Sequence, residues 1–296
     1  MNEFYAVEPS VFSNTAELKF FMEKFGPESG RYLRLYPMDW RTLVERHLEG
    51  LRPIEEARVR SIINNAQKTM RLIYSPRLPY KQDKAWVENV IPLTETIPPR
   101  VVEAYCAEPH EHLAAVLMED MDLPPTAEEQ IQSTPSEYVR VTETLLTESA
   151  ELYFIDPYLN PCRRDRYTVL LEMFKCIAKS DKCQRIVLVA RYDDVISKNN
   201  ETDVALNMKK LKEISGLESK CELVLTLYDD CVSIDQMHPR YLFSIKGGVR
   251  LDRGFQQMPK NRAVDVAPIS PKLLSRVIEV YQEGQNDMVL KLKLTA

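Results

Sequence analysis

Two groups of residues in the second half of the chain have types and spacing that suit phosphate chemistry. The first is Asp-Pro-Tyr-Leu, residues 156–159, which directly follows an apolar run. The second lies at the predicted start of the next helix and contains Arg163, Arg164 and Arg166. Backbone amides at a helix start and guanidinium groups both favour an anion. We therefore expect negatively charged ligands at this point of the chain.

A third group surrounds one histidine. His238 precedes a predicted strand, Arg240 follows two residues later, and Lys246 lies in the turn of the following hairpin. Imidazole can carry protons, and guanidinium and ammonium groups bind phosphate oxygens. A surface hairpin with ordinary alternation of polar and apolar residues is the alternative interpretation. The three groups together predict a phosphate site made of these residues: Asp156, Tyr158, Arg163, Arg164, His238, Arg240 and Lys246.

The elements that must position these groups form a regular pattern after residue 136. Apolar runs predict strands, and apolar residues at helical spacing predict helices between them. The predicted strands are 151–155, 185–190, 222–228, 241–245, 249–251 and 288–294, and the predicted helices are 136–149, 163–179, 201–214 and 271–283. This order predicts an α/β sandwich with a mixed sheet, residues 137–296, in which ligands lie at the carboxyl ends of the parallel strands.

The first half of the chain predicts a different organisation. Asp39 can cap a helix that ends before Gly50, and Pro53 opens an apolar helical pattern of roughly 20 residues. The apolar run 113–118 predicts a further helix. Residues 1–118 are therefore expected to form a mainly helical domain that contacts protein partners. The acidic, proline-containing segment 119–136 is expected to be a linker.

The chemistry-bearing groups also carry a resemblance to a known family. Asp-Pro-Tyr-Leu after a strand, followed by His-x-Arg-Tyr-Leu-x-x-x-x-Gly-Gly-Val-x-Leu-x-x-Gly-Phe, resembles the phospholipase D-like superfamily. The likeness is greatest to its divergent branch, which includes the C-terminal domain of MIT-domain proteins and bacterial domains with a His-Asp-Arg motif. It covers residues 137–296. Related bacterial domains often accompany mobile-element and defence genes, so the resemblance implies a role in antiviral defence.

The resemblance also implies a mechanism, from which this sequence departs. Active members use His-x-Lys-x4-Asp, in which His forms a phospho-enzyme and Lys binds the phosphate. His238 matches the nucleophile, whereas Arg240 replaces the Lys and Ile245 replaces the Asp; Pro239 also departs from the divergent branch. Arginine still permits phosphate binding, but loss of an orienting carboxylate lowers the rate of a proton-transferring His by about 10²- to 10⁴-fold.

The sequence therefore favours a weakly active or inactive module with a degenerate motif. We expect it to bind a phosphate-bearing ligand, either a nucleic acid or an anionic lipid headgroup, or to scaffold a protein assembly. The alternative is a phosphodiesterase or nuclease that forms a homodimer, because two motifs must meet and this chain has one. Its catalytic residue would be His238 from each subunit, and Asp235 or Asp252 could supply the missing carboxylate.

Composition excludes several other classes. The net charge of −5 is concentrated in residues 101–150, which sum to −10, and neither flank has the strong positive excess of a non-specific nucleic-acid binder. The six cysteines include no C-x-x-C pair and are expected to be reduced and mostly buried. His110 and His112 make a weak zinc pattern, so we expect no metal and no cofactor. No secretory signal or membrane-length apolar run is found, and we expect a cytoplasmic protein.

Overall fold

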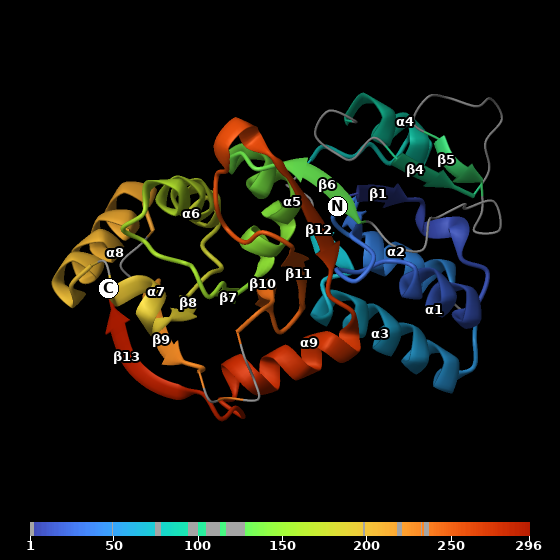
Figure 1. Ribbon diagram of the computed structural model, residues 1–296. Helices are drawn as coiled ribbons and strands as arrows, with labels where there is room; N and C mark the ends of the chain where they lie inside the picture. Colours follow the sequence, from blue (N-terminus) through green and yellow to red (C-terminus); the bar gives the residue numbers. More distant parts are fainter. Residues whose placement is uncertain are drawn as a thin grey trace. The chain divides into compact units, whose positions relative to one another are not determined.

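The chain divides into two compact units, each built around its own β-sheet (Figure 1). The computed structural model describes residues 3–48, 50–74, 78–93, 100–104, 113–116, 128–197, 199–217, 221–231, 233 and 237–296. The first unit is Asn2–Ala127 and the second begins at Glu128 and ends at Ala296.

The first unit contains a parallel five-stranded sheet. Its strands are β1 (Glu3–Val7), β2 (Arg31–Leu35), β3 (Leu72–Tyr74), β4 (Arg100–Glu103) and β5 (Leu113–Val116), in the order β3-β2-β1-β4-β5. Its α-helices are α1 (Thr15–Glu23), α2 (Trp40–His47), α3 (Pro53–Lys68) and α4 (Trp86–Val90). Apolar residues of α1, α2 and α3 pack on one set of strand side chains, which includes Tyr5 and Val7. Trp86 and Val90 of α4 pack on the alternate set, which includes Ala6.

The prediction of a mainly helical first domain is therefore wrong. The helices at Trp40–His47 and Pro53–Lys68 are confirmed, but a parallel sheet lies between the helical layers. Its strands are three to five residues long, too short for their apolar pattern to be distinguished from a loop or a helical turn. The segment predicted as a helix from residue 113 is strand β5, which is also too short for its pattern to be recognised.

The second unit contains a mixed eight-stranded sheet. Its strands are β6 (Glu129–Gln132), β7 (Glu151–Ile155), β8 (Arg185–Arg191), β9 (Glu222–Asp229), β10 (Arg240–Ser244), β11 (Gly247–Leu251), β12 (Ala263–Pro268) and β13 (Val289–Thr295). The order is β13-β9-β8-β7-β10-β11-β12-β6. Strands β7, β8 and β9 are parallel, and the other pairs are antiparallel. The prediction of an α/β fold with a mixed sheet is confirmed for this unit.

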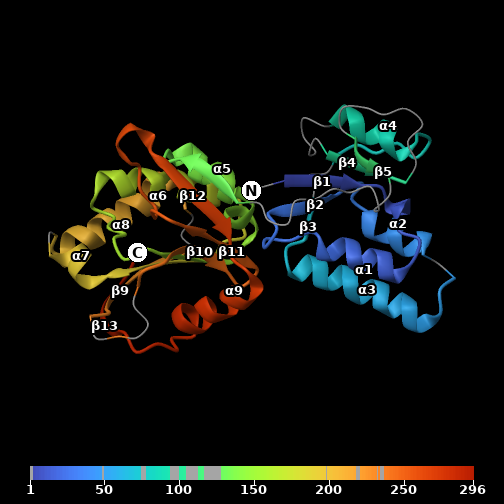
Figure 2. The same ribbon diagram turned by 45° about the vertical axis from the view of Figure 1, so that its right-hand side comes forward.

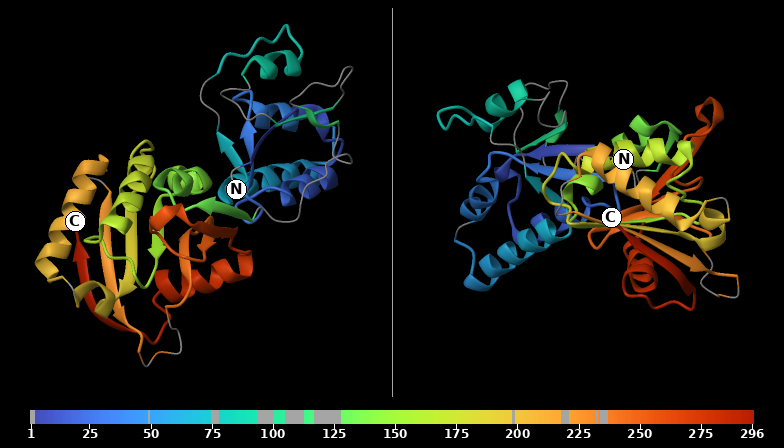
Figure 3. Two further views of the ribbon diagram at one scale, coloured as in Figure 1. Left: turned by 45° about the horizontal axis from the view of Figure 1, so that its top comes forward. Right: turned by 90° about the vertical axis from the view of Figure 1, so that its left-hand side faces the viewer.

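Helices cover both faces of this sheet. They are α5 (Pro135–Glu148), α6 (Arg164–Ile177), α7 (Tyr192–Ile196), α8 (Glu201–Ser215) and α9 (Pro271–Val277), the last continued by a π-helical turn, Ile278–Gln282. Figure 2 shows α5, α6 and α8 on one side of the strands and α9 on the other, and the right-hand view of Figure 3 shows the same layers. On the first side Phe154 of β7 packs against Phe174 of α6 at 5.8 Å between ring centres. Both faces of the sheet are therefore buried at β7, β8 and β9, as the near-continuous apolar runs of these strands require.

The segment predicted as a linker is partly structured. Residues 129–132 form strand β6, which pairs with β12 at one edge of the sheet, and α5 begins at Pro135 with Thr134 as its cap. Only Ile131 of β6 is buried, so the strand carries little apolar signal in its sequence. Residues 119–127 lie outside the described residues, as do His110 and His112.

Candidate phosphate site

The sheet register brings two of the predicted groups together. Strand β10 runs antiparallel to β7, and Tyr241 pairs with Ile155. Arg240, the residue before Tyr241, is therefore next to Asp156, the residue after Ile155, and Arg240 Nε lies 3.9 Å from Asp156 Oδ1. The predicted neighbourhood of the Asp-Pro-Tyr-Leu segment and the His-x-Arg segment is thus a consequence of strand pairing.

Asp156 is the buried centre of this edge. Only 1% of its surface is exposed, and its two carboxylate oxygens accept hydrogen bonds from the backbone N–H groups of Tyr158 and Phe255, at 2.9 and 3.1 Å. Burial raises the pKa of Asp156, an effect that these hydrogen bonds and the charges of Arg166 and Arg240 oppose. Asp156 therefore connects the Asp-Pro-Tyr-Leu segment to the Gly-Phe segment, Gly254 and Phe255.

Gly254 permits this close approach. Its φ is +72°, and a Cβ atom there would lie 2.1 Å from Asp156 Oδ2. The loop that contains Gly254 is also held by Tyr138, whose hydroxyl donates to the carbonyl oxygens of Gly254 and Gln256 at 2.9 and 3.0 Å. A residue with a side chain at position 254 cannot adopt this arrangement without displacing the carboxylate.

Arg166 is a buried cation at the same edge. Its side chain is 5% exposed, and its Nη1 bonds Asp165 Oδ2 at 2.7 Å. Burial lowers the pKa of Arg166, and the charge of Asp156 opposes that change. The Nε–H group of Arg166 is buried without a hydrogen-bond partner, and so is that of Arg240. Most buried donors in folded proteins have a hydrogen-bond partner, and these two Nε–H groups both belong to arginines whose charge acts on Asp156.

Tyr158 links Arg240 to a second arginine. The guanidinium carbons of Arg240 and Arg191 lie 5.6 and 5.9 Å from the centre of its ring, within the range of a cation–π contact. Arg191 in turn forms a bidentate pair with Asp230, at 2.7 and 3.0 Å. Asp230 also accepts the backbone N–H of Met237, at 2.8 Å. This chain of contacts fixes the backbone immediately before His238, and the hydrogen bond from Arg191 lowers the pKa of Asp230.

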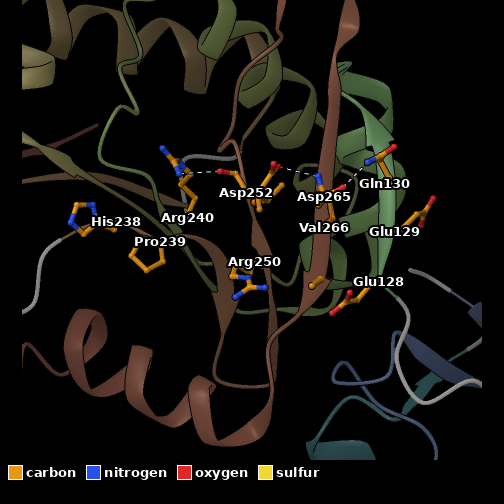
Figure 4. A pocket seen from close by; sticks show the side chains of 12 residues that line it. Glu128, Glu129, Gln130, His238, Pro239, Arg240, Arg250, Asp252, Asp265 and Val266 are labelled. Atoms are coloured by element: carbon orange, nitrogen blue, oxygen red, sulfur yellow. Dashed lines mark hydrogen bonds between the residues drawn. The ribbon is translucent and has the colours of Figure 1, made fainter.

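A pocket of about 620 Å³ opens beside Arg240. Figure 4 shows His238 and Asp252 on either side of Arg240, and acidic side chains at the β6 end. Arg240 Nη1 donates to the carbonyl oxygen of Asp252 at 3.0 Å. The lining residues are Glu128, Glu129, Gln130, His238, Pro239, Arg240, Arg250, Leu251, Asp252, Asp265, Val266 and Ala267. The cationic edge therefore adjoins an acidic wall.

The arginines at the start of α6 have different surroundings. Arg163, the residue before the helix, forms two 3.1 Å hydrogen bonds with Asp165. Arg164 is exposed at the first helical position. Because the β7-α6-β8 crossover connects parallel strands, this helix start lies at the same sheet edge as Asp156.

Lys246 lies away from the other predicted site residues. It lies beyond the carboxyl end of β10, whereas Arg240 begins that strand. Its Nζ donates to the carbonyl oxygen of Glu148 at the end of α5, at 2.7 Å. An extended strand of five residues separates the two cations by about 17 Å or more, so they cannot share one phosphate.

The surroundings of His238 bear on its predicted catalytic role. His238 is exposed on the segment before β10. Asp252 is engaged elsewhere: its Oδ1 accepts the backbone N–H of Asp265 at 3.0 Å, and its Oδ2 lies 3.4 Å from Arg253 Nε. Ile245, which stands where the motif of the resembled family has an Asp, is 67% exposed in the hairpin turn. Asp235 lies outside the described residues.

The predicted list of site residues leaves out three contributors to this edge. Arg166 was grouped with its neighbours, although its spacing to Val169 and Leu170 places it on the buried face of α6. Arg191 and Asp230 each follow a buried apolar strand, and that position was the available signal. A charged residue on an apolar stripe indicates a paired or functional charge.

The described part of the chain offers neither a metal site of clustered ligands nor a membrane-spanning helix. It contains no cluster of three or more His, Cys, Asp or Glu side chains placed to hold a metal ion. No helix in the same part is long and apolar enough to cross a bilayer.

Comparison with known proteins adds little. No protein-family model and no curated protein matches the sequence. Among solved structures, TrmBL2, an archaeal chromatin protein with a novel mode of DNA binding, is similar at 10% sequence identity and a TM-score of 0.30, over 85% of this chain and 69% of that chain. At this TM-score the similarity carries no argument about fold or function.

Proposed function

We propose that the unit Glu128–Ala296 is a phospholipase D-like module that binds a phosphate-bearing ligand at the edge formed by Asp156, Arg166 and Arg240. The observation that carries the proposal is the pair of buried Nε–H groups of Arg166 and Arg240 that lack hydrogen-bond partners. An unsatisfied buried donor costs roughly 1–3 kcal/mol, and more when the group is charged. Phosphate oxygens, like carboxylate oxygens, are acceptors that guanidinium groups match well.

The local chemistry supports binding more strongly than turnover. Arg240 occupies the position of the family's Lys, and a guanidinium group cannot give up its proton near neutral pH. Ile245 supplies no carboxylate, and Asp252 is bonded to Asp265 and Arg253. We therefore propose a module without robust phosphodiesterase activity.

Equilibrium binding to two probes tests this proposal: a fluorescent single-stranded oligonucleotide and vesicles that contain phosphatidylserine. Arg240→Met should weaken binding by about 10- to 100-fold, since a hydrogen bond to a charged group contributes about 1.5–3 kcal/mol. Lys175→Met is the matched control, because Lys175 lies in the last turn of α6 and pairs with Glu172 on the surface. It should bind as the wild type does.

The salt dependence of binding separates the two ligand classes. Oligonucleotide binding should fall steeply with salt through counterion release. If the ligand is a lipid headgroup, the protein should bind the vesicles and should not bind the oligonucleotide. Failure to bind either probe would contradict phosphate recognition and favour a protein scaffold.

Hydrolysis of a generic phosphodiester tests the claim of inactivity. We expect no turnover by the purified chain, either as a monomer or as a homodimer. Turnover that disappears in His238→Ala, while that variant retains its circular dichroism spectrum, would establish the enzymatic alternative. Turnover that survives the substitution would come from another source.

A further inference from the structure

The opposite edge of the same parallel strands carries a pair of thiols. Cys183 lies two residues before β8, and Cys221 directly precedes β9. The two strands are neighbours, with Arg185 paired to Glu222, and the backbone N–H of Glu222 donates to the carbonyl oxygen of Gln184 at 2.9 Å. Strand pairing therefore places the two cysteines at neighbouring strand starts, although they lie 38 positions apart in the sequence.

The two side chains contact each other within a small cavity. Cys183 is 9% exposed and Cys221 is 3% exposed, and both line a cavity of about 330 Å³. The Cys183 thiol donates a weak hydrogen bond to the carbonyl oxygen of Arg185 at 3.5 Å, and the two thiols lie near enough for each to change the pKa of the other. Both cysteines are reduced in the structure. A small reagent that enters the cavity would therefore meet two adjacent sulfur atoms.

The pair is chemically asymmetric. Interaction with the Cys183 thiol, together with the positive charge of Lys212, lowers the pKa of Cys221. The same interaction, together with burial, raises the pKa of Cys183. Because the thiolate is the reactive species, this difference would make Cys221 the nucleophile of the pair and Cys183 the resolving thiol.

We propose that Cys183 and Cys221 form a peroxide-reactive thiol pair that closes to a disulfide. The Cys221 thiolate attacks one oxygen of hydrogen peroxide, the O–O bond breaks, and Cys221 sulfenic acid and hydroxide form. The Cys183 sulfur then displaces the sulfenic oxygen, which leaves as water with the Cys183 proton. Two thiols are oxidised and one peroxide is reduced to two waters. The disulfide would join the starts of β8 and β9.

Treatment of the full chain with hydrogen peroxide tests this proposal. Alkylation under denaturing conditions and peptide mass spectrometry should find a Cys183–Cys221 cross-link, with a mass lower by about 2 Da through loss of two hydrogens. Cys231 is the internal control, because it is exposed and has its pKa raised by the neighbouring carboxylate of Asp229. Recovery of free Cys183 and Cys221 after Cys231 has been consumed would overturn the proposal.

Two single variants test the assigned asymmetry. In Cys183→Ser the cross-link should be lost and Cys221 should accumulate as sulfenic acid, which dimedone traps. In Cys221→Ser, Cys183 should give little or no dimedone adduct. The opposite labelling pattern would contradict the roles assigned here. Thermal melting of both variants, in which oxygen replaces a single sulfur atom, shows whether each is folded when labelled.

Discussion

The two sheets present the same kind of edge with different chemistry. In the first unit, the carboxyl ends of β1 and β4 are adjacent, since Val7 pairs with Val102. The residue after β1 is Glu8, whose carboxylate accepts hydrogen bonds from Ser10 Oγ at 2.7 Å and from the N–H of Ala104 at 2.9 Å. In a parallel sheet of order β3-β2-β1-β4-β5 this is the point where ligands usually bind. In this unit the Glu8 carboxylate is used for hydrogen bonds to neighbouring loop residues.

The corresponding edge of the second unit carries guanidinium groups. Arg166, Arg191 and Arg240 meet around Asp156 and Tyr158, and two of their Nε–H groups remain unsatisfied. The topology therefore supplies the position of a site, whereas the residues that follow the strands determine whether an anion can bind there.

The largest effect on this comparison is expected from Gly254→Ala. The new methyl group would overlap the Asp156 carboxylate, at 2.1 Å, in a backbone conformation with φ of +72°. We expect a loss of about 4 kcal/mol in the free energy of unfolding, measured by urea titration. Phosphate binding should be lost as well.

Gly216→Ala is the matched control for that change. Gly216 has a similar φ of +74°, but no atom lies within 4 Å of a Cβ placed there. It should cost only the left-handed conformation, about 1 kcal/mol. Equal losses in the two variants would show that the contact with Asp156 has no energetic weight.

A smaller loss is expected when the Arg191–Asp230 pair is broken. Asp230 is 4% exposed, so Asp230→Asn leaves the arginine without its main counterion and should cost about 3 kcal/mol at pH 7. The hydrogen bond from Arg191 lowers the pKa of Asp230 in the folded state. Its stabilisation is therefore complete above the unfolded-state pKa of about 3.9 and is lost as the pH falls through the lower folded-state pKa.

Urea unfolding of the wild type and Asp230→Asn over a pH series measures this dependence. The difference between the two proteins should shrink as the pH falls below about 4. A difference that stays constant with pH would mean that the pair contributes through packing alone.

On the acidic edge, Glu8→Gln should have a modest effect. The amide can retain one of the two hydrogen bonds, so we expect a loss of about 1 kcal/mol in stability. Phosphate affinity, measured by calorimetry, should not change. Weakened phosphate binding in this variant would move the site to the first unit.

The smallest effect on binding is expected from Lys246→Met. This cation was predicted for the site but bonds the end of α5 instead. The variant should bind phosphate as the wild type does in the same calorimetric assay. A tenfold loss of affinity would show that the hairpin turn takes part in binding after all.

The sequence predicted the second unit better than the first, for physical reasons. Strands β7, β8 and β9 are buried on both faces and are five to eight residues long, so their apolar runs stand out. Strands such as β3, with three residues, and β6, with one buried side chain, have no comparable signal. Their pairing depends on distant segments.

The residues of the candidate site could be predicted where their positions depend on strand order. They could not be predicted where their positions depend on the direction in which a side chain faces. The meeting of Asp156 with Arg240 follows from adjacent strands, and the sequence groups anticipated it. The burial of Arg166 and the removal of Lys246 depend on which way each side chain faces and on the length of β10. Only the packed structure settles those two features.

Side-chain NMR of the full chain, titrated with inorganic phosphate, tests the central claim most directly. The Nε–H resonances of Arg166 and Arg240 report on the two unsatisfied donors, and that of Arg31, which pairs with Glu3 in the first unit, is the control. The account predicts saturable shifts of both donors, with Arg31 unchanged. Resonances of Arg166 and Arg240 that do not move as phosphate is added, or that move only in proportion to ionic strength together with Arg31, would contradict it.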